Sequence, residues 1–582
     1  MSSEEASDVS LDRWARLLLG GLARAGLREV ILSPGSRSTP FAWAALHTPE
    51  LACHSVWDER AAGFFALGLA RVSGRPALLL CTSGSAAANY FPAVVEASLS
   101  RVPLVILTAD RPFELQAAAA AQTIDQIKLY GDFARQFFEL GLPDSSPSAL
   151  RGLLRIAQQA ALVSLHPEPG PVQLNARAKK PLEPVRLPEL RERLEAEVSG
   201  LLEQAPLPIA TPEISPAPSA LAELARACAR ARSGLIVCGP APLGDSRSLH
   251  ALAELSLHTG FPLLAEATSQ LRFPPPGSPC ERARNIDGFD FVLRSAELRH
   301  ALLPEIVLCC GAPPTSTGLD LLLQEAPEYH VLAVHGFPDP RSRATSLSLG
   351  PPAAMAQALL GLIPEPPSAL SEARRLYAER FARADAAGWK AVTTVLAGGE
   401  KLHEGAAVRA AIEALPRGSL LVLGNSLPVR EVDQYVRAGS RALGVVSQRG
   451  ANGIDGIVSG AAGAALAHAG PTLLLVGDVS FLHDLAGLDL CRRAERPLVL
   501  FVLDNAGGRI FEQLPMAEHF AAEPELSRYW LTPPDVDLEH AALLFGLPYA
   551  RAETPAELTG ALTGALERRG ATLIHARIEP ES

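Results

Sequence analysis

The stretch PTLLLVGDVS (471–480), with PLVLFVLDNAGG (497–508) after it, decides the fold of the C-terminal part of the chain. Each piece is a short apolar run, rich in Leu and Val, that ends in Gly, Asp or Asn, which is typical of a strand buried in a parallel sheet. A helical pattern starting near Phe481 occupies the segment between them. Because crossovers between parallel strands are right-handed, both runs are predicted to end at the same edge of one sheet.

Asp478 and Asn505 close the two runs, so their side chains are predicted to converge at this edge, where open α/β sheets bind ligands. A carboxylate and a carboxamide, joined by a main-chain carbonyl at Gly507, offer the oxygen ligands that Mg²⁺ or Mn²⁺ accepts. The helix after Asp478 presents amides that suit phosphate groups. Alternatively, GD and DNAGG are ordinary strand-ending turns, since Gly, Asp and Asn are common turn residues. Their joint spacing favours the metal site.

The same alternation of apolar runs and helical patterns recurs along the chain and predicts three consecutive α/β domains with parallel sheets. The other runs are EVILS (29–33), ALLLCTS (77–83), PLVILTAD (103–110), GLIVCGPAP (234–242), EIVLCCGAPP (305–314), HVLAVHG (330–336) and SLLVLGNS (419–426). Proline-rich stretches at 203–220 and 361–370 separate the sets, and a charged helix that bridges two domains is expected after the second. The predicted domains cover 1–185, 206–365 and 400–582.

Composition narrows the class of protein. The 582 residues carry a formal net charge of -11, and this acidic balance argues against nucleic-acid binding, which requires a basic surface. No apolar run is long enough for a membrane helix, so membrane insertion is not expected, and the N-terminus MSSEEASDVSLDRW lacks the pattern of a signal peptide. The eight cysteines show no metal-ligand spacing and are expected to be reduced, which predicts a cytoplasmic protein.

Several stretches near the N-terminus place polar side chains where predicted strands end. In DERAAGFFALGLA (58–70), Glu59 opens a helix, where it is either a partner of the helix dipole or a catalytic acid. Ser83 and Gly84 form a tight turn that lets the backbone approach a ligand, and Arg111 follows another strand. In ILSPGSRSTPF (31–41), hydroxyls surround Arg37, whose planar guanidinium suits carboxylates.

Together these stretches resemble thiamine diphosphate-dependent enzymes, and within them the 2-succinyl-5-enolpyruvyl-6-hydroxy-3-cyclohexene-1-carboxylate synthase family of menaquinone biosynthesis. The superfamily's diphosphate and metal motif is usually G-D-G followed by N-N, whereas this chain has Gly-Asp-Val and Asp504-Asn505. The strings that carry the family likeness are SPGSRSTP (33–40), DERAAGFFALGLA (58–70), TSGSAAAN (82–89), TADRPFEL (108–115), QTIDQ (122–126), GNSLPVR (424–430), RGANGIDG (449–456) and VGDVSFLHDL (476–485).

The resemblance implies a pyrimidine-binding, a central and a diphosphate-binding domain, in that order. It implies thiamine diphosphate and Mg²⁺ (or Mn²⁺) as cofactors, and decarboxylation of 2-oxoglutarate followed by conjugate addition of the succinyl carbanion to isochorismate. In such enzymes a site forms between the first domain of one chain and the third domain of its partner, so a homodimer or homotetramer is implied.

The resemblance also implies roles for individual residues. Glu59 is the catalytic glutamate that hydrogen-bonds the pyrimidine, and Ile454 supports the bent form of the cofactor. The implied cofactor-binding residues are Glu59, Ser83, Gly84, Ile454, Asp478, Asn505 and Ile510, and the implied metal ligands are Asp478, Asn505 and Gly507. The implied substrate-binding residues are Ser36, Arg37, Arg111 and Gln122 around isochorismate, Ser426, Arg430 and Arg449 around the oxoglutarate-derived carboxylates, and Phe511 and Leu514, which with Ile510 form an apolar wall.

Two features of the pattern and two rival functions stay open at this point. Ala121 stands where some relatives carry a polar residue, and Arg294 is an additional cation without an assigned role. One rival is another 2-oxoacid decarboxylase or an acetohydroxyacid-type synthase, which would not need arginines at 37, 111, 430 and 449. The other is a nucleotide-binding oxidoreductase or a catalytically silent binding protein. The chain lacks a G-x-G-x-x-G fingerprint after a strand, which argues against the oxidoreductase, and it keeps Glu59, Asp478 and Asn505, which argues against a silent protein.

Overall fold

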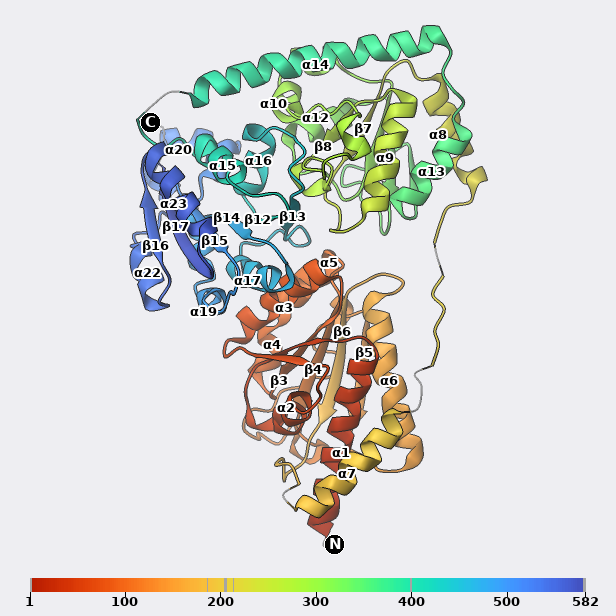
Figure 1. Cartoon of the computed structure of the whole chain (residues 1–582), viewed down its shortest axis with the longest axis vertical. Coiled ribbons are helices and arrows are strands. Elements are labelled where there is room, and N and C mark those ends of the chain that lie inside the picture. The colour runs from red at the N-terminus through yellow and green to blue at the C-terminus, as the bar shows by residue number, and fades with distance from the viewer. Residues whose placement is uncertain (1–2, 186, 204–206, 213, 398–399, 579–582) are drawn as a thin grey trace. The chain divides into compact units, whose positions relative to one another are not determined.

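The computed structural model describes the chain except for residues 1–2, 186, 204–206, 213, 398–399 and 579–582 (Figure 1). Within the described residues, the strands form three sheets of six, five and six strands, and every strand pair is parallel. The α/β class with parallel sheets is therefore confirmed. The ends of the predicted domains at residues 1, 206 and 582 lie outside the described residues, and the domain boundaries stay predictions.

The first sheet has the strand order β2-β1-β3-β4-β6-β5. Its inner strands are apolar and almost fully buried, which explains why the runs at 29–33, 77–83 and 103–110 could be identified from sequence. The strands are β1 (Glu29–Leu32), β2 (Ala52–Ser55), β3 (Ala77–Cys81), β4 (Leu104–Asp110), β5 (Gln136–Gly141) and β6 (Pro171–Arg177). The helices of this segment are α1 (Ser3–Arg24), α2 (Thr39–Leu46), α3 (Glu59–Ser73), α4 (Ser85–Asn89), α5 (Phe91–Leu99), α6 (Pro147–Leu165) and α7 (Pro188–Leu202), with 3-10 turns η1 (Ser36–Ser38), η2 (Phe113–Leu115) and η3 (Gly131–Phe133).

The second sheet has the order β11-β10-β9-β7-β8. Its strands are β7 (Gly234–Cys238), β8 (Leu263–Ala265), β9 (Ile306–Cys310), β10 (Glu328–Ala333) and β11 (Ser346–Leu349). Its helices are α8 (Pro218–Arg230), α9 (Ser246–Thr259), α10 (Phe289–Arg294), α11 (Ala296–Ala301), α12 (Thr317–Glu325), α13 (Pro352–Leu362) and α14 (Ser368–Leu396), with η4 (Ala267–Ser269) and η5 (Pro279–Glu281).

The third sheet has the order β13-β12-β14-β15-β17-β16. Its strands are β12 (Leu420–Leu423), β13 (Gly444–Ser447), β14 (Thr472–Gly477), β15 (Leu498–Asp504), β16 (Tyr549–Ala552) and β17 (Ala571–Arg577). The helices of this segment are α15 (Glu404–Glu413), α16 (Pro428–Tyr435), α17 (Ile457–Ala467), α18 (Asp478–His483), α19 (Gly487–Cys491), α20 (Ala517–Ala522), α21 (Pro524–Leu531), α22 (Leu538–Leu544) and α23 (Pro555–Glu567), with η6 (Arg509–Gln513). The register pairs Gly477 with Leu503, so the two runs end side by side as predicted.

The segments between the sheets match the sequence expectations with two differences. In the proline-rich stretch 203–220, residues 204–206 and 213 lie outside the described residues, and 207–212 and 214–217 have no regular secondary structure. The first difference is that helix α8 begins inside this stretch, at Pro218. The predicted charged helix is α14, whose Trp389 donates to Asp287 and lies under the guanidinium of Arg409 on α15. The helix expected from Phe481 begins three residues earlier, at Asp478.

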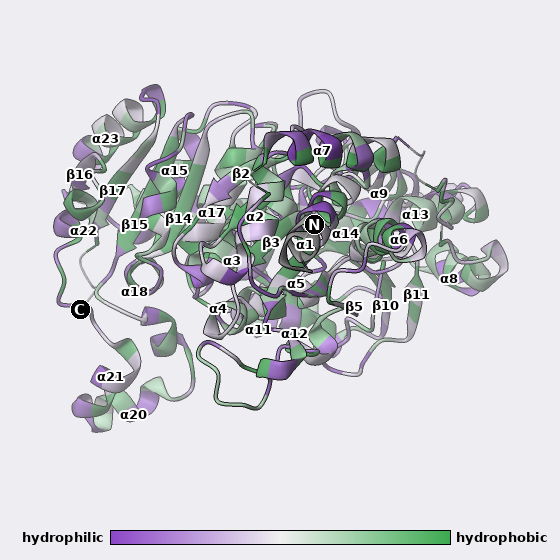
Figure 2. Ribbon diagram, turned by 90° about the horizontal axis from the view of Figure 1, so that it is seen from below, coloured by the Kyte–Doolittle hydropathy of each residue, from purple (hydrophilic) through white to green (hydrophobic). Residues whose placement is uncertain are grey.

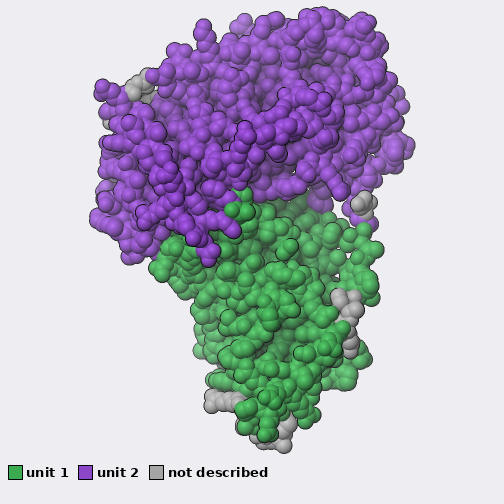
Figure 3. All heavy atoms as spheres, viewed as in Figure 1, with its two compact units in different colours: residues 1–211, 448–469, 483–494 green, residues 212–447, 470–482, 495–582 purple. Residues whose placement is uncertain are grey.

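The chain divides into two compact units (Figure 3). Unit 1 comprises 1–211, 448–469 and 483–494, and unit 2 comprises 212–447, 470–482 and 495–582. Apolar side chains are buried in both, and Figure 2 shows strands such as β15 as largely hydrophobic. All eight cysteines are free thiols, as predicted, and all but Cys53 are buried. Along the part of the chain that the structure describes, no helix has the length and apolar character of a membrane span.

Within unit 1, helices α3 and α17 pack backbone to backbone through glycines. A Cβ on Gly68 would lie 1.9 Å from the carbonyl oxygen of Gly460, and a Cβ on Gly463 would lie 1.9 Å from that of Phe65. Gly456, at the start of α17, meets the ring of Phe64 near the start of α3, so the two helices run in the same general direction. No residue with a side chain fits at these positions without separating the helices, so the contact requires glycine.

Substitution of Gly68 by Ala is expected to lower the free energy of unfolding by about 1–3 kcal/mol, because the added methyl overpacks a contact between two backbones. Gly152→Ala is the matched control, since Gly152 lies inside α6 and a Cβ added there would meet nothing within 4 Å, and the change should stabilise by about 0.5–1 kcal/mol. Urea unfolding followed by circular dichroism measures both. Equal effects of the two substitutions would contradict the tight contact.

Candidate active site

Asp478 lies at the carboxyl end of β14, where its carboxylate is held by two main-chain amides. Oδ1 accepts from the amide of Val479 and Oδ2 from the amide of Gly507, each at 2.8 Å. The second bond joins the loop after β15 to the loop after β14, so the predicted metal ligands Asp478 and Gly507 are neighbours. Gly507 has φ +121 and a Cβ there would lie 2.2 Å from the carbonyl oxygen of Leu531, so only glycine fits.

The donor set around Asp478 suits a hard divalent cation. Burial, with a contribution from the nearby Asp504, raises the pKa of Asp478 to about 6, and a bound cation would favour the ionised form. Asn505 donates its amide Nδ2 to Oε1 of Glu404 at 2.8 Å, which directs the donor side of the carboxamide away and leaves its oxygen as the ligand atom. Within the described ranges, no cluster of three His, Cys, Asp or Glu side chains could hold a metal, so the set comprises one carboxylate, one carboxamide and one carbonyl.

Two glutamates behind Asn505 were not predicted from the sequence. Glu404 and Glu431 hydrogen-bond each other through their carboxyl groups, and burial raises the pKa of both, that of Glu431 well above its ordinary value. Both stand in the first turn of a helix, α15 and α16 respectively, where an acidic residue usually only complements the helix dipole. The sequence therefore carried no signal that distinguished them.

Asp504 explains how the chain tolerates Asp where the superfamily motif has its first Asn. Its Oδ2 lies 2.8 Å from Nε2 of His575 and also accepts from Arg577, and these bonds outweigh burial to lower the pKa of Asp504. Both partners lie on the adjacent strand β17. Asp504 thus bonds to a cross-strand cluster and also lies beside Asp478, whose pKa it raises, while the side chain of Asn505 bonds to Glu404.

Ser426 and Arg430 lie together in unit 2, as predicted, at the turn between β12 and α16. Arg430 donates from Nη1 to the carbonyl oxygen of Ser426 at 2.6 Å, and Ser426 has φ +72, a backbone conformation that is strained for serine. Burial lowers the pKa of Arg430, while Glu266 and Asp290 oppose this and Arg294 adds to it. The central segment therefore contributes charged neighbours to this turn, including the unassigned Arg294.

The three predicted apolar contacts follow Gly507 and Gly508. Ile510 and Phe511 lie in η6 and are half-buried, and Leu514 follows η6 with 44 % of its side chain exposed. None of the three belongs to the buried core, so ordinary core packing does not account for them.

In unit 1, the turn ILSPGSRSTPF connects β1 to α2 through η1, as predicted. Arg37 is buried, its main-chain amide donates to Oγ1 of Thr82 at 3.1 Å and its Nη1 donates to the carbonyl oxygen of Ala178 at 2.5 Å. Burial lowers the pKa of Arg37, and the neighbouring Arg111 lowers it further, against the opposing effect of Asp110. Ser36 beside it is exposed.

Several donors around Arg37 are buried without a hydrogen-bond partner. Among the described residues, Nε of Arg37, Nε of Arg111 and Oγ of Ser83 each lack one. Two close guanidinium groups and an unpartnered hydroxyl form a site that an anion would complete, because buried polar groups are otherwise costly. Gly84 adjoins this group with φ +91, and Gln122, with φ +53, is exposed and approaches to 3.4 Å of a Cβ built on Gly84.

Glu59 is the first residue of α3, after the N-cap Asp58, whose side chain accepts from the amide of Arg60. The carboxylate is half-buried and raises the pKa of two buried neighbours, Cys81 and Tyr90, in addition to the larger effect of their burial. Glu59 therefore faces the interior of unit 1, next to the strand that leads to Ser83 and Gly84.

The loop that carries Arg449 and Ile454 is also part of unit 1. The buried carboxylate of Glu96 accepts from the amides of Gly450, at 3.0 Å, and Ala451, at 2.7 Å. Glu96 also pairs with Arg71 of α3 at 3.1 Å, so the same helix begins with Glu59 and anchors this loop. Sequence reasoning missed Glu96, because a lone acidic residue in an apolar helix gives no indication of its partner.

Asp484 holds the start of α17 after this loop. Its oxygens accept from the amide of Ser459 at 2.6 Å and from its hydroxyl at 2.9 Å. Burial raises the pKa of Asp484 to about 6, those hydrogen bonds oppose the rise, and Asp58 adds to it. Arg60 is the nearby cation.

Each unit by itself thus brings together a subset of the predicted residues. Unit 1 holds Ser36, Arg37, Glu59, Ser83, Gly84, Arg111, Gln122, Arg449 and Ile454, and unit 2 holds Ser426, Arg430, Asp478, Asn505, Gly507, Ile510, Phe511 and Leu514.

Comparison with protein families supports a thiamine diphosphate enzyme. Residues 12–129 match a family described as thiamine pyrophosphate enzyme, N-terminal TPP binding domain, and residues 434–576 match thiamine pyrophosphate enzyme, C-terminal TPP binding domain. Two solved structures show the same fold. A benzoylformate decarboxylase from Polynucleobacter necessarius matches with TM-score 0.70 and 15% identity, over 98% of this chain and 99% of that chain. An enzyme from Mycobacterium smegmatis described as a putative thiamin diphosphate-dependent enzyme matches with TM-score 0.69 and 18% identity, over 96% of this chain and 98% of that chain.

Several relatives that align with nearly the whole chain carry the same name. A 2-succinyl-5-enolpyruvyl-6-hydroxy-3-cyclohexene-1-carboxylate synthase from Sorangium cellulosum is 48% identical over 97% of this chain and 92% of the relative. Proteins of the same name from Roseiflexus castenholzii and Myxococcus xanthus are 39% and 38% identical, over 97% and 99% of this chain and 95% and 96% of the relatives.

The raised pKa of Asp484 predicts how stability depends on pH. Its pKa of about 6 in the folded protein exceeds the value of about 3.9 for an exposed aspartate, so the folded state binds the proton more tightly. The stabilisation that protonated Asp484 gives the folded protein is fully present below about pH 4 and is lost as pH rises through about 6. Between these limits the free energy of unfolding falls by about 2–3 kcal/mol. Asp484→Asn removes this titration. Urea unfolding at pH 4.5 and 7.5 should show a smaller pH effect in the variant, and parallel pH profiles would contradict the assignment.

Proposed function

The chain belongs to the 2-succinyl-5-enolpyruvyl-6-hydroxy-3-cyclohexene-1-carboxylate synthase family of thiamine diphosphate-dependent enzymes, and from this premise we propose its substrates and residue roles. It decarboxylates 2-oxoglutarate and adds the resulting four-carbon unit to isochorismate, in menaquinone biosynthesis. The substrates are anions that differ in shape, so the protein needs fixed cations in more than one place.

The observation that carries the choice of substrates is the pair of neighbouring arginines, the buried Arg37 and the half-buried Arg111, whose Nε atoms are both buried without a hydrogen-bond partner. Arg111 lowers the pKa of Arg37, and a ligand carboxylate beside Ser83 would compensate the positive charge there. An enzyme that acts only on a small 2-oxoacid with a single carboxylate would not need this additional cationic position. We assign isochorismate to this position, with Ser36 and Gln122 at its edge.

The carboxylates from 2-oxoglutarate are assigned to Ser426, Arg430 and Arg449. The strained backbone of Ser426 and its bond to the Arg430 guanidinium hold both groups in one orientation. Glu266 and Asp290 keep Arg430 charged despite its burial, so it stays competent to bind an anion.

The residues present fit thiamine diphosphate and a divalent cation. Asp478, Asn505 and Gly507 would hold the cation and through it the diphosphate, Ser83, Gly84, Ile454 and Ile510 would contact the rings, and Glu59 would bind the pyrimidine. When bound, the coenzyme supplies the carbon nucleophile and the electron sink for decarboxylation. Glu59 would hold a proton at the ring nitrogen, and Ile510, Phe511 and Leu514 would exclude water from the reacting carbon.

We further propose a homodimer or homotetramer that works in the cytoplasm. The free, mostly buried cysteines suit a reducing compartment, and the complementary residue sets of the two units suit a site shared between copies of the chain.

Mass spectrometry of the product tests the function directly. Purified protein with thiamine diphosphate, Mg²⁺, 2-oxoglutarate and isochorismate should release carbon dioxide and form 2-succinyl-5-enolpyruvyl-6-hydroxy-3-cyclohexene-1-carboxylate. The Glu59→Gln variant should stay folded but turn over about 100-fold or more slowly, because the carboxyl group that holds the proton is lost. Removal of metal and coenzyme by EDTA and gel filtration should abolish turnover until both are restored. Release of carbon dioxide from pyruvate but not from 2-oxoglutarate would refute the proposal.

A pair of substitutions tests which arginine serves which substrate. Arg111→Met should raise the KM for isochorismate about ten-fold or more, and Arg430→Met should raise the KM for 2-oxoglutarate by a similar factor, because each loses a charged hydrogen bond to a carboxylate. Each variant serves as the control for the other in steady-state assays. If both variants raised both KM values equally, the assignment of separate positions would fail.

A further inference from the structure

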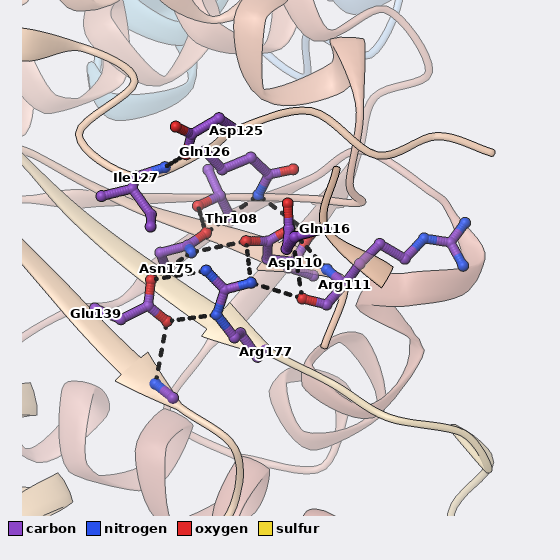
Figure 4. Close-up of polar contacts among 12 residues, drawn as sticks. Thr108, Asp110, Arg111, Gln116, Asp125, Gln126, Ile127, Glu139, Asn175 and Arg177 are labelled. Atoms are coloured by element: carbon purple, nitrogen blue, oxygen red, sulfur yellow. Dashed lines mark hydrogen bonds and ion pairs between the residues drawn. The ribbon is translucent and has the colours of Figure 1, made fainter. Parts of the chain in front are cut away.

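A continuous network of polar groups, most of them buried, lies at the carboxyl ends of β4 and β6 and includes the backbone of Arg111 (Figure 4). Its centre is the ion pair between Asp110 and Arg177, at 3.0 Å, in which each side chain is only 1% exposed. Glu139 on β5 accepts from Arg177 at 3.1 Å and provides a second carboxylate. The network is not part of the site described above, because none of these side chains is among the predicted ligands.

The network holds Arg111 by its backbone and leaves its side chain for other contacts. The amide of Arg111 donates to Oδ1 of Asp110 at 2.7 Å, and its carbonyl oxygen accepts from Nη1 of Arg177 at 2.8 Å. Figure 4 shows the guanidinium of Arg111 extending away from these groups. The buried pair therefore fixes where this side chain starts without neutralising it.

Asn175 and Gln126 extend the network toward Gly84. Asn175 donates to Oδ2 of Asp110 at 3.0 Å, and its Oδ1 accepts from Nε2 of Gln126 at 3.1 Å. The fully buried Gln126 in turn accepts, through Oε1, the amide of Gly84 at 3.1 Å. A chain of hydrogen bonds thus runs from the amide of Gly84, through two carboxamides and one carboxylate, to the amide of Arg111.

We propose that Gln126 is a positioning residue that links the Gly84 turn, which contacts the coenzyme, to the backbone of Arg111, which serves isochorismate. The two carboxamides can each donate and accept in only one orientation here, so the position of one end constrains the other. Gly84 has φ +91, and the bond from its amide to Gln126 stabilises that conformation. This inference rests on the proposed function for the identity of the two ligands.

Gln126→Met tests the proposal, because methionine has nearly the same length and removes the hydrogen bonds of the side chain to Gly84 and Asn175, together with the longer one to the carbonyl oxygen of Ala109 at 3.5 Å. The dissociation constant for thiamine diphosphate, titrated in the presence of Mg²⁺ by tryptophan fluorescence, should rise about ten-fold, and the KM for isochorismate should rise about ten-fold, while the KM for 2-oxoglutarate changes less than about two-fold. Gln126→Glu keeps the acceptor for Gly84, so it should bind the coenzyme more tightly than the Met variant. If the Met variant does not fold, comparison of the Gln126→Glu variant with the wild type tests the proposal.

Thr108→Val is the matched control. Thr108 is buried on β4 and donates to the same Oδ1 of Asn175 at 2.9 Å, but it lies outside the chain from Gly84 to Arg111. It should lower thermal stability to a similar extent and leave both the coenzyme dissociation constant and the KM for isochorismate within about two-fold of wild type. Equal effects of the Val and Met variants, or unchanged constants in both Gln126 variants, would overturn the proposal.

The wild-type protein separates this inference from the proposed function. If the wild type forms the expected product and the Gln126 variants bind the coenzyme and isochorismate normally, only the inference fails. If the wild type forms no product, the proposed function fails, and the direct titration of thiamine diphosphate still decides whether Gln126 positions the coenzyme turn.

Discussion

The contact between α3 and α17 is the constraint on which unit 1 depends. It joins a helix from the first 75 residues to one beyond residue 456 at a distance that only glycines permit. Because the two helices run in the same direction, their N-terminal ends meet at the same side, and these ends carry Glu59 and the loop with Arg449 and Ile454. The buried carboxylates of Glu96, which pairs with Arg71, and of Asp484 accept from main-chain amides and so fix that loop and the start of α17. A packing requirement between backbones therefore sets where the residues proposed to bind the coenzyme and substrate begin.

The groups at the two proposed ligand positions differ in charge, and each set matches what it is proposed to bind. Among its described residues, unit 1 buries guanidinium donors without partners, at Arg37 and Arg111, as an anion site requires. Unit 2 buries carboxyl groups whose pKa values rise, at Asp478, Glu404 and Glu431, as a region that meets a cation requires. Leaving such groups uncompensated would cost stability, so both arrangements are explained by ligands of opposite charge.

Much of the fold could be predicted because the central parallel strands are continuous apolar runs, and Asp478, Asn505, Ser83 and Arg111 do follow the ends of such strands. Edge strands such as β2 and β11 escaped prediction since they are only half-buried and lack such runs. Strand β6, PVQLNAR, escaped for the opposite reason: it is fully buried, but Gln173, Asn175 and Arg177 make it look exposed. Which carboxylate meets which amide depends on segments far apart in sequence, so Glu404, Glu431 and Glu96 could not be identified from one chain alone.

The buried pair of Asp110 and Arg177 is better explained by geometry than by stability. Removing two charges from water costs about as much as their attraction returns, and well-packed apolar residues of similar volume often serve stability equally well. Apolar substitutes would nevertheless leave the amide and carbonyl of Arg111 and the amide group of Asn175 without partners in a buried region. The charges of Asp110 and Arg177 are therefore needed to hold the backbone of Arg111 in one conformation at the end of β4, while the guanidinium of Arg111 extends away from the pair. A sheet edge that must present a cation to a ligand needs a second cation, already neutralised, to support it.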